Sequence, residues 1–389
     1  MKAIHHKPAP PRDVSPRGCR RLKTNDIRPE KTRGAEEDKA MSGSRKFTND
    51  YSELCHPDVL AALNRAAEAG EQNTAYGLDK HSAAAADAIR RVFGLPEGEV
   101  FLLTGGTQTN MTVISYLLRP YEAALACGTG HINVHETGAV EGSGHKVITC
   151  PGRDGRILPD EAERLILLHA DEHMVKPGLI YISDATETGS VYTASELLAL
   201  RKVCDRHGLY LFIDGARLAS ALTAPGTDVT PGLIGQVADV FYIGGTKNGL
   251  LSGEAVVFRD GSLCGGFRRH IKNRGAMLAK GFVLGIQFEA LFSDGLFFRM
   301  AEHANGLAEG LRKSLRKAGA ELTGSSPTNQ IFVRLDADAA ETLISEFGLE
   351  RWEVHGDGRE TVRIVTSFAS DEKSCRALGE RVAELLRKK

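Results

Sequence analysis

The chain has 389 residues, of which 42% are hydrophobic and 25% charged, a composition that excludes an intrinsically disordered or fibrous protein. Its length predicts two domains, and no apolar run approaches the ~20 residues that span a bilayer, which argues against a membrane protein. The net charge of -1 gives no reason to expect nucleic acid or an anionic membrane as a partner.

The seven cysteines are dispersed along the chain and form no CxxC pair. This pattern favours free thiols in a reducing compartment over a disulfide framework or a zinc site. We therefore expect a cytoplasmic enzyme without a bound metal.

The first 46 residues differ in composition from the rest of the chain. They contain 13 lysines and arginines against 6 aspartates and glutamates, together with 5 of the 14 prolines. Because such a segment buries too little apolar surface to offset its ordering entropy, we expect residues 1–46 to be disordered. The composition is compatible with a transit peptide and equally with an extension ahead of a start at Met41, so no function is assigned to this segment.

From residue 47 onward, short apolar strands alternate with amphipathic helices. This alternation is typical of right-handed βαβ units around a mostly parallel sheet, so we expect residues 47–260 to form a large α/β domain. The expected strands are 99–104, 121–127, 145–149, 178–183, 209–213 and 239–243, and the expected helices are 57–70, 80–93, 107–119, about 131–140, 159–170 and 193–207.

After about residue 260 the pattern changes, because long helical stretches come first and strands return only later. This order predicts connecting helices and a smaller α+β domain over residues 261–389. The expected helices are 263–294, 296–318, 338–347 and 371–388, and the expected strands are 331–335, 351–355 and 361–366.

Two polar residues follow buried strands, at the edge where an open α/β sheet binds its ligands. Asp214 ends the strand 209–213, and Lys247 follows the strand 239–243 within a glycine-rich turn. Taken singly, Asp214 is also compatible with a helix cap, and Lys247 with an exposed turn. Together they match what pyridoxal 5'-phosphate (PLP) needs, a lysine for the Schiff base and an acid that keeps the pyridine nitrogen protonated.

Two further segments are candidates for the same site. The run Gly105-Gly-Thr-Gln-Thr-Asn110 turns from a strand into a helix, where free amides can hold a phosphate, although an ordinary helix start gives the same pattern. His131 precedes His135 and Glu136, but no metal-binding motif is completed there. A ring stacked on a cofactor and a structural histidine both remain open for His131.

The ordered set of these motifs resembles the low-specificity L-threonine aldolases of the β-eliminating lyase group, over roughly residues 47–385. The resemblance implies PLP-dependent transferase fold type I, with helices on both faces of the central sheet and a smaller C-terminal domain. The motifs are Asp214-Gly-Ala-Arg217, Gly244-Gly-Thr-Lys-Asn-Gly249 with Gly253-Glu-Ala-Val256, Gly106-Thr-Gln-Thr-Asn110, His131 with Glu136-Thr-Gly138, Ala75-Tyr-Gly77 and Thr186-Glu-Thr-Gly-Ser-Val191.

The resemblance also implies a role for individual residues. Lys247 would carry the cofactor, Asp214 would pair with its ring nitrogen, and His131 would stack on the ring. Gly106, Thr107, Lys272 and Lys280 would bind the phosphate, with some of the basic residues coming from a neighbouring subunit. Arg217 and Arg363 would bind the substrate carboxylate or support the site. His173 would lie near the substrate hydroxyl, and Asn49 and Ser52 would belong to the segment that folds over the site.

The implied activity is the cleavage of a small amino acid into glycine and an aldehyde. The substrate would be threonine, allo-threonine or a related β-hydroxy-α-amino acid. His173, or a water held by His131 and His173, would take the hydroxyl proton. A β-eliminating lyase, an aminotransferase and a non-catalytic PLP-binding protein are the alternatives. Because this fold builds its site at a subunit interface, we expect a homodimer or homotetramer. Neither nucleic acid nor a membrane is expected as a partner.

Overall fold

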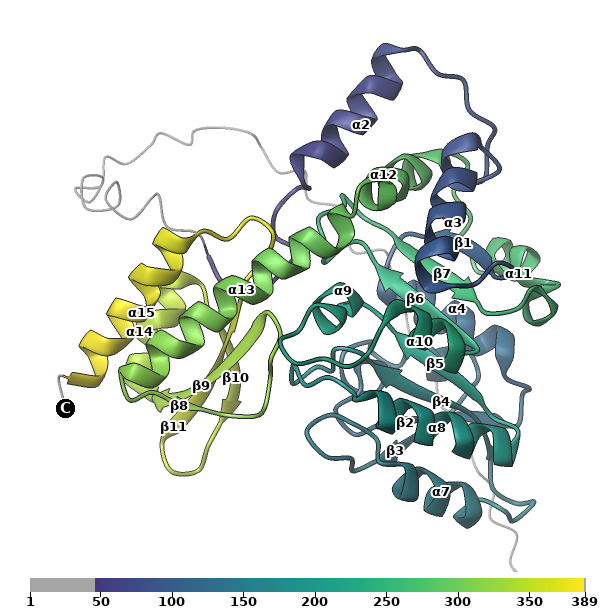
Figure 1. Cartoon of the computed structure of the whole chain (residues 1–389). Coiled ribbons are helices and arrows are strands. Elements are labelled where there is room, and N and C mark those ends of the chain that lie inside the picture. The colour runs from purple at the N-terminus through teal and green to yellow at the C-terminus, as the bar shows by residue number, and fades with distance from the viewer. Residues whose placement is uncertain (1–45, 388–389) are drawn as a thin grey trace, which may run out of the picture. The chain divides into compact units, whose positions relative to one another are not determined.

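The computed structural model describes residues 46–387, and these belong to one compact unit that begins at Ser44. Of the residues 1–46 that were expected to be disordered, residues 1–45 lie outside the described residues. Two sheets organise the chain, one of seven strands and one of four (Figure 1).

The larger sheet has the strand order β1-β7-β6-β5-β4-β2-β3. Strands β2 to β6 are mutually parallel, whereas β7 is antiparallel to both of its neighbours, which confirms a mostly parallel α/β sheet. Its strands are β1 (Glu99–Leu103), β2 (Glu122–Cys127), β3 (Val147–Cys150), β4 (Lys176–Ser183), β5 (Tyr210–Asp214), β6 (Val240–Gly244) and β7 (Glu254–Phe258).

Helices cover both faces of this sheet, because neighbouring strand residues alternate between two apolar clusters. Ile213 packs on one face with side chains from α3, α7, α8, α10 and α12, and Phe212 packs on the other with side chains from α4, α5 and α11. The helices of this part are α2 (Pro57–Glu68), α3 (Lys80–Phe93), α4 (Gly106–Leu117), α5 (His131–Val134), α6 (Ala139–Gly142), α7 (Pro159–Leu168), α8 (Ala194–His207), α9 (Leu218–Leu222), α10 (Pro231–Val237), η1 (Gly261–Cys264), α11 (Phe267–Asn273) and α12 (Phe282–Ser293).

The smaller sheet is antiparallel, with the order β10-β11-β9-β8. A third apolar cluster fills the space between this sheet and the helices α13, α14 and α15. The elements are α13 (Leu296–Lys317), β8 (Glu321–Leu322), β9 (Gln330–Asp336), α14 (Ala337–Phe347), β10 (Glu350–Val354), β11 (Arg359–Val365) and α15 (Glu372–Arg387).

Local signals explain where several helices begin and end. Helix α8 begins with a capping box between Thr193 and Glu196 and ends at Gly208, which has φ 67°. Asp79 caps α3 by accepting a hydrogen bond from the Ser82 amide, and Gly94 ends that helix with the same φ of 67°. These ends agree with the expected ranges.

Two expectations about elements were wrong, and one strand of the larger sheet was missed. The stretch 263–294 is broken into η1, α11 and α12, since Gly275 takes a φ of 69° after α11 and interrupts the helix. The helix expected near 131–140 is two short helices, with Thr137 and Gly138 at positive φ between them. Strand β7 was not anticipated, because a glutamate and two nearby glycines weaken its apolar pattern.

The six described cysteines are free thiols. Within residues 46–387, no helix combines the length and apolarity needed to cross a membrane.

Candidate active site

A cavity of about 300 Å³ lies where the chain leaves the carboxyl ends of β4, β5 and β6. Ser183, Asp214 and Lys247 line it from these three positions. Gly106 and Thr107, at the start of α4 just after β1, line the same cavity. The structure therefore brings together the motifs that the sequence places just after strand ends.

Close backbone contact holds the turns after β5 and β6 together. The Gly244 amide donates to the Gly215 carbonyl at 2.9 Å. A Cβ atom at Gly215 would lie 1.9 Å from the Tyr242 carbonyl oxygen, and one at Gly244 would lie 2.3 Å from the Ala216 oxygen. Only glycine allows this approach, which sets Asp214 and Lys247 in one cavity.

Asp214 is 3% exposed and accepts hydrogen bonds from several groups. The donors are the Tyr181 hydroxyl, Asn110 Nδ2 at 3.0 Å and the Ala216 amide at 3.0 Å. Burial by itself would raise the pKa of Asp214, but His131 and these side-chain hydrogen bonds lower it below its usual value. The group is thus an ionised carboxylate, and none of the described residues forms an ion pair with it.

His131 is held by a carboxylate that also binds the Asp214 network. Its Nδ1 lies 2.7 Å from Glu136 Oε1, and the same oxygen accepts a hydrogen bond from Asn110 Nδ2 at 2.8 Å. The His131 amide donates to Glu187 at 2.9 Å. Because Nδ1 is engaged and the ring lines the cavity, Nε2 is the nitrogen free to meet a ligand.

Lys247 is partly buried and lies 5.8 Å from the centre of the Tyr51 ring. Burial lowers the pKa of its amine, and the positive charge of Arg217 lowers it further. No hydrogen bond or ion pair engages this amine within residues 46–387. A lysine with a depressed pKa and no partner is suited to nucleophilic attack on a carbonyl.

The start of α4 provides amides that line the cavity. Gly105 precedes this 12-residue helix and offers no side-chain cap. The first amides of the helix, including those of Gly106 and Thr107, have no partner inside the helix. They point to an anion site, since helix N-termini favour negative charge.

Arg217 follows β5 and lines the cavity, and its guanidinium forms two hydrogen bonds with Asp50. Arg363 lies on β11 of the smaller sheet, where it bonds Gln330 at 3.2 Å and contacts Glu350. Arg363 is not among the residues that line the cavity. Burial lowers the pKa of Arg363, and the charge of Arg217 lowers it further.

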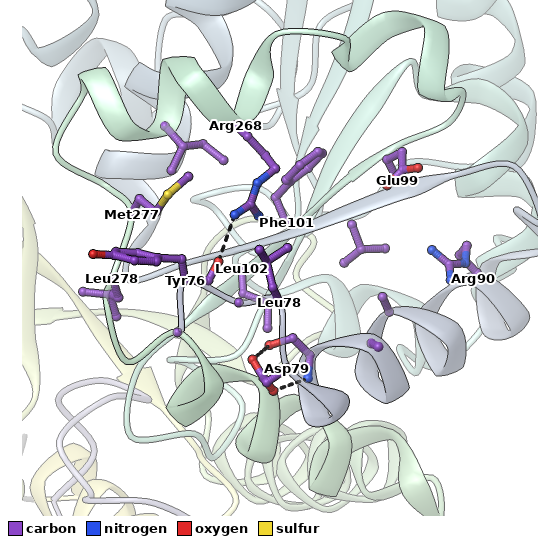
Figure 2. A pocket seen from close by; sticks show the side chains of 17 residues that line it. Tyr76, Leu78, Asp79, Arg90, Glu99, Phe101, Leu102, Arg268, Met277 and Leu278 are labelled. Atoms are coloured by element: carbon purple, nitrogen blue, oxygen red, sulfur yellow. Dashed lines mark hydrogen bonds between the residues drawn. The ribbon is translucent and has the colours of Figure 1, made fainter. Parts of the chain in front are cut away.

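Other predicted site residues lie outside the cavity. Lys272 and Lys280 are exposed, and Lys272 lies 5.0 Å from the centre of the Tyr76 ring. Tyr76 borders a separate pocket of about 380 Å³ and accepts a hydrogen bond from Arg268 at its carbonyl (Figure 2). A single chain does not bring these lysines to the phosphate position.

His173 is also outside the cavity. It is exposed and precedes the amino end of β4, whereas the carboxyl end of that strand lines the cavity. The expectation that His173 approaches the substrate hydroxyl is therefore not met within one chain. Ser52 donates to Asn49 at 2.9 Å, and neither residue lines the cavity although the neighbouring Tyr51 does.

Two acidic residues of the site received no role from the sequence, although Glu254 lies within the motif Gly253-Glu-Ala-Val256. Asp50 is 2% exposed and bonds Arg217, which lies 167 positions later in the chain. Glu254 begins β7, lines the cavity and accepts a hydrogen bond from the Gly245 amide at 3.1 Å. Burial raises the pKa of Glu254 to about 8. A charged residue at the start of an apolar strand was the available signal for Glu254, whereas no local pattern marks Asp50.

Comparison with known proteins agrees with this geometry. A sequence model of the family described as beta-eliminating lyase matches residues 56–338. A low-specificity L-threonine aldolase from Pseudomonas sp. (strain NCIMB 10558) is 33% identical over 86% of this chain and 96% of its own length. The solved threonine aldolase of Leishmania major is 42% identical, covers 88% of this chain and 99% of its own, and has a TM-score of 0.86.

More distant structures share the fold. A Thermus thermophilus aspartate aminotransferase is 18% identical, covers 90% of this chain and 94% of its own, and has a TM-score of 0.66. A PLP-bound aminotransferase from Clostridium difficile 630, described as putative in its name, is 13% identical, with coverage of 88% and 92% and a TM-score of 0.68. These similarities confirm the predicted aminotransferase fold. The chain belongs to the beta-eliminating lyase family, in the group that includes the low-specificity L-threonine aldolases.

Proposed function

We propose that this chain is a PLP-dependent aldolase, a carbon–carbon lyase that cleaves L-threonine, L-allo-threonine or a related β-hydroxy-α-amino acid into glycine and an aldehyde. The observation that carries the proposal is the presence of Asp214 and Lys247 in one cavity. The threonine aldolases of Pseudomonas and Leishmania major support the choice of reaction.

The residues around the cavity fit PLP. Asp214 is an ionised, buried carboxylate without a cationic partner among the described residues, as required for a protonated pyridine nitrogen. Lys247 supplies an unengaged amine for the Schiff base, and the amides at Gly106 and Thr107 suit the phosphate. His131 offers a flat ring beside Asp214. When bound, PLP supplies a cationic ring that accepts the electron pair of the breaking Cα–Cβ bond.

The protein's own groups then bind the substrate and move its protons. Arg217 and Arg363 hold the α-carboxylate, because a planar guanidinium matches that group. A water held at His131 Nε2 accepts the β-hydroxyl proton while Glu136 fixes Nδ1. Loss of this proton lets the oxygen form the aldehyde carbonyl as Cα separates from Cβ. Cα then gains a proton, and glycine leaves.

The assembly and location of the protein are part of the proposal. A homodimer or homotetramer is supported by the exposed position of Lys272 and Lys280, which a single chain leaves away from the cavity. The dispersed free thiols support the cytoplasm.

The test is the visible spectrum of the purified protein before and after glycine, followed by product analysis with threonine. A cofactor band that shifts to longer wavelength with glycine, and release of glycine and acetaldehyde from threonine, are expected. Pyruvate and ammonia in their place would identify a β-eliminating lyase, and exchange that depends on a keto acid would identify an aminotransferase. A protein without any cofactor band after addition of PLP contradicts the proposal.

A further inference from the structure

We infer that Asp50 is a positioning residue for the substrate carboxylate, because it occupies one edge of the Arg217 guanidinium and leaves another edge for the substrate. This inference rests on the proposed function, which assigns Arg217 to the substrate. Asp50 itself does not contact the reacting atoms.

The ion pair between Asp50 and Arg217 has a defined geometry. Arg217 Nε lies 2.7 Å from Asp50 Oδ2, and Nη2 lies 3.0 Å from Oδ1. The Arg217 side chain is 9% exposed and the Asp50 side chain is 1% exposed. Two parallel hydrogen bonds in a buried place fix the plane of the guanidinium as well as its position.

The N–H groups of Arg217 that Asp50 does not use decide what else this side chain can bind. A guanidinium has five N–H groups, and Asp50 uses one on Nε and one on Nη2. The two on Nη1 and the second on Nη2 remain, and no described residue engages Nη1. This remaining edge can bind a carboxylate by donating two hydrogen bonds to it. Because Arg217 lines the cavity, that carboxylate can belong to the substrate.

Asp50 is in turn fixed by the smaller sheet. Asn329 Nδ2 donates to Asp50 Oδ2 at 3.0 Å and to the Thr366 carbonyl at 2.8 Å. Three positions before Asp50, the Phe47 carbonyl accepts a hydrogen bond from the Val365 amide at 2.9 Å. Val365 stands two positions after Arg363 on β11, so one segment is anchored beside both arginines.

Charge balance supports the same role. Burial alone would raise the pKa of Asp50, but Arg217, Lys247 and the hydrogen bonds lower it, so the carboxylate is ionised. Its negative charge also stabilises the charged form of Arg363. Without it, Arg217 would lose both of its hydrogen bonds to Asp50 and the negative charge that favours its charged form.

The test compares glycine with methylamine, which lacks the carboxylate, on the full chain purified in the presence of PLP. Calorimetry measures both affinities in the wild type, Asp50→Asn and Asp50→Glu. For Asp50→Asn we expect glycine to bind roughly 10- to 100-fold more weakly and methylamine to change by less than about 3-fold. KM for threonine is expected to rise by a similar factor with a smaller fall in kcat, and Asp50→Glu is expected to restore part of the affinity.

A matched control is Asp87→Asn, which removes an aspartate paired with Arg90 on the surface of α3 and is expected to leave both affinities unchanged. If Asp50→Asn does not fold, Asn329→Ala removes one bond to Asp50 and is expected to weaken glycine selectively, by less. The inference is overturned if Asp50→Asn weakens the binding of glycine and methylamine equally, or does not weaken the binding of glycine. A wild type that does not bind glycine also overturns it. A wild type that binds glycine without a cofactor band contradicts the proposed function alone, since calorimetry needs no band.

Discussion

The three carboxyl groups that line the cavity do not share one charge state. The pKa of Asp214 is lowered, whereas burial raises the pKa of both Glu187 and Glu254. Environments that separate the pKa values of neighbouring acids assign them different roles. Asp214 is suited to hold a cation, whereas burial favours the protonated, uncharged form of Glu254.

The substitution Lys247→Ala is expected to leave the fold intact and to abolish covalent attachment of PLP, because no other described amine lines the cavity. Wild-type protein treated with borohydride should retain the mass of the cofactor after denaturation, and the variant should not. A variant that stays yellow and becomes reducible by borohydride would place the Schiff base on another lysine.

Glu254→Gln is expected to change how folding stability depends on pH. The pKa of Glu254 is about 8 in the folded chain, above that of an unfolded glutamate, so the unfolded state releases its proton first as the pH rises. This stabilising contribution is complete below about pH 4 and is lost progressively up to about pH 8. Cofactor-free Glu254→Gln should therefore gain a few kcal/mol relative to the wild type at pH 9 compared with pH 4. Denaturant unfolding at the two pH values measures the difference, and an equal difference at both would show that Glu254 is ionised in the folded protein.

At the scale of elements, the contact between the turns after β5 and β6 is the tightest requirement of the site. Gly215→Ala is expected to destabilise the chain by about 3 kcal/mol, since its Cβ would meet a carbonyl oxygen that cannot move freely. Gly306→Ala, in α13, has no atom within 4 Å of the new Cβ and is expected to stabilise the chain by up to about 1 kcal/mol. Urea unfolding of both variants tests the contrast, and similar behaviour of the two would contradict it.

An ion network connects the start of α3 with α12. His81 lies between Glu71 at 2.7 Å and Glu289 at 2.5 Å. Burial opposes the charge on His81, but the hydrogen bonds that its ring donates to the two carboxylates raise its pKa overall. The stabilisation is fully present below about pH 6 and is lost as the pH rises through the raised pKa of the folded state. The wild type should therefore lose stability between pH 6 and pH 9 by thermal unfolding, and His81→Ala should lose less; parallel profiles would exclude His81 as the cause.

The sequence predicted the elements whose signals are local. Strand ends followed by polar residues located Asp214 and Lys247, and the glycine-rich run after β1 located the start of α4. The partners of these residues were not predictable in the same way. Asn110 reaches Asp214 across 104 positions and Asp50 reaches Arg217 across 167, and no periodic pattern encodes such pairs.

At the scale of the whole molecule, the proposed assembly is supported by apolar side chains that are exposed beside one pocket. Tyr76 is 42% exposed, Leu78 62% and Leu278 40%, and all three border the pocket in Figure 2. Light scattering is expected to give at least twice the chain mass of 42.0 kDa. Leu78→Asp should reduce the mass, whereas Val354→Asp, at another exposed apolar position, should not. A strictly monomeric protein with full activity would contradict the expected assembly.

The segment that carries Asp50 has a consequence for the order of folding. Asp50 lies near the start of the described chain, and its partner Asn329 lies 279 positions later. During synthesis, the strands of the larger sheet can pair before Asn329 and β11 have been made, but the carboxylate site cannot close until nearly the whole chain is available. A nascent or C-terminally shortened chain would therefore have an assembled larger sheet and an incomplete substrate site, so catalytic competence is acquired last.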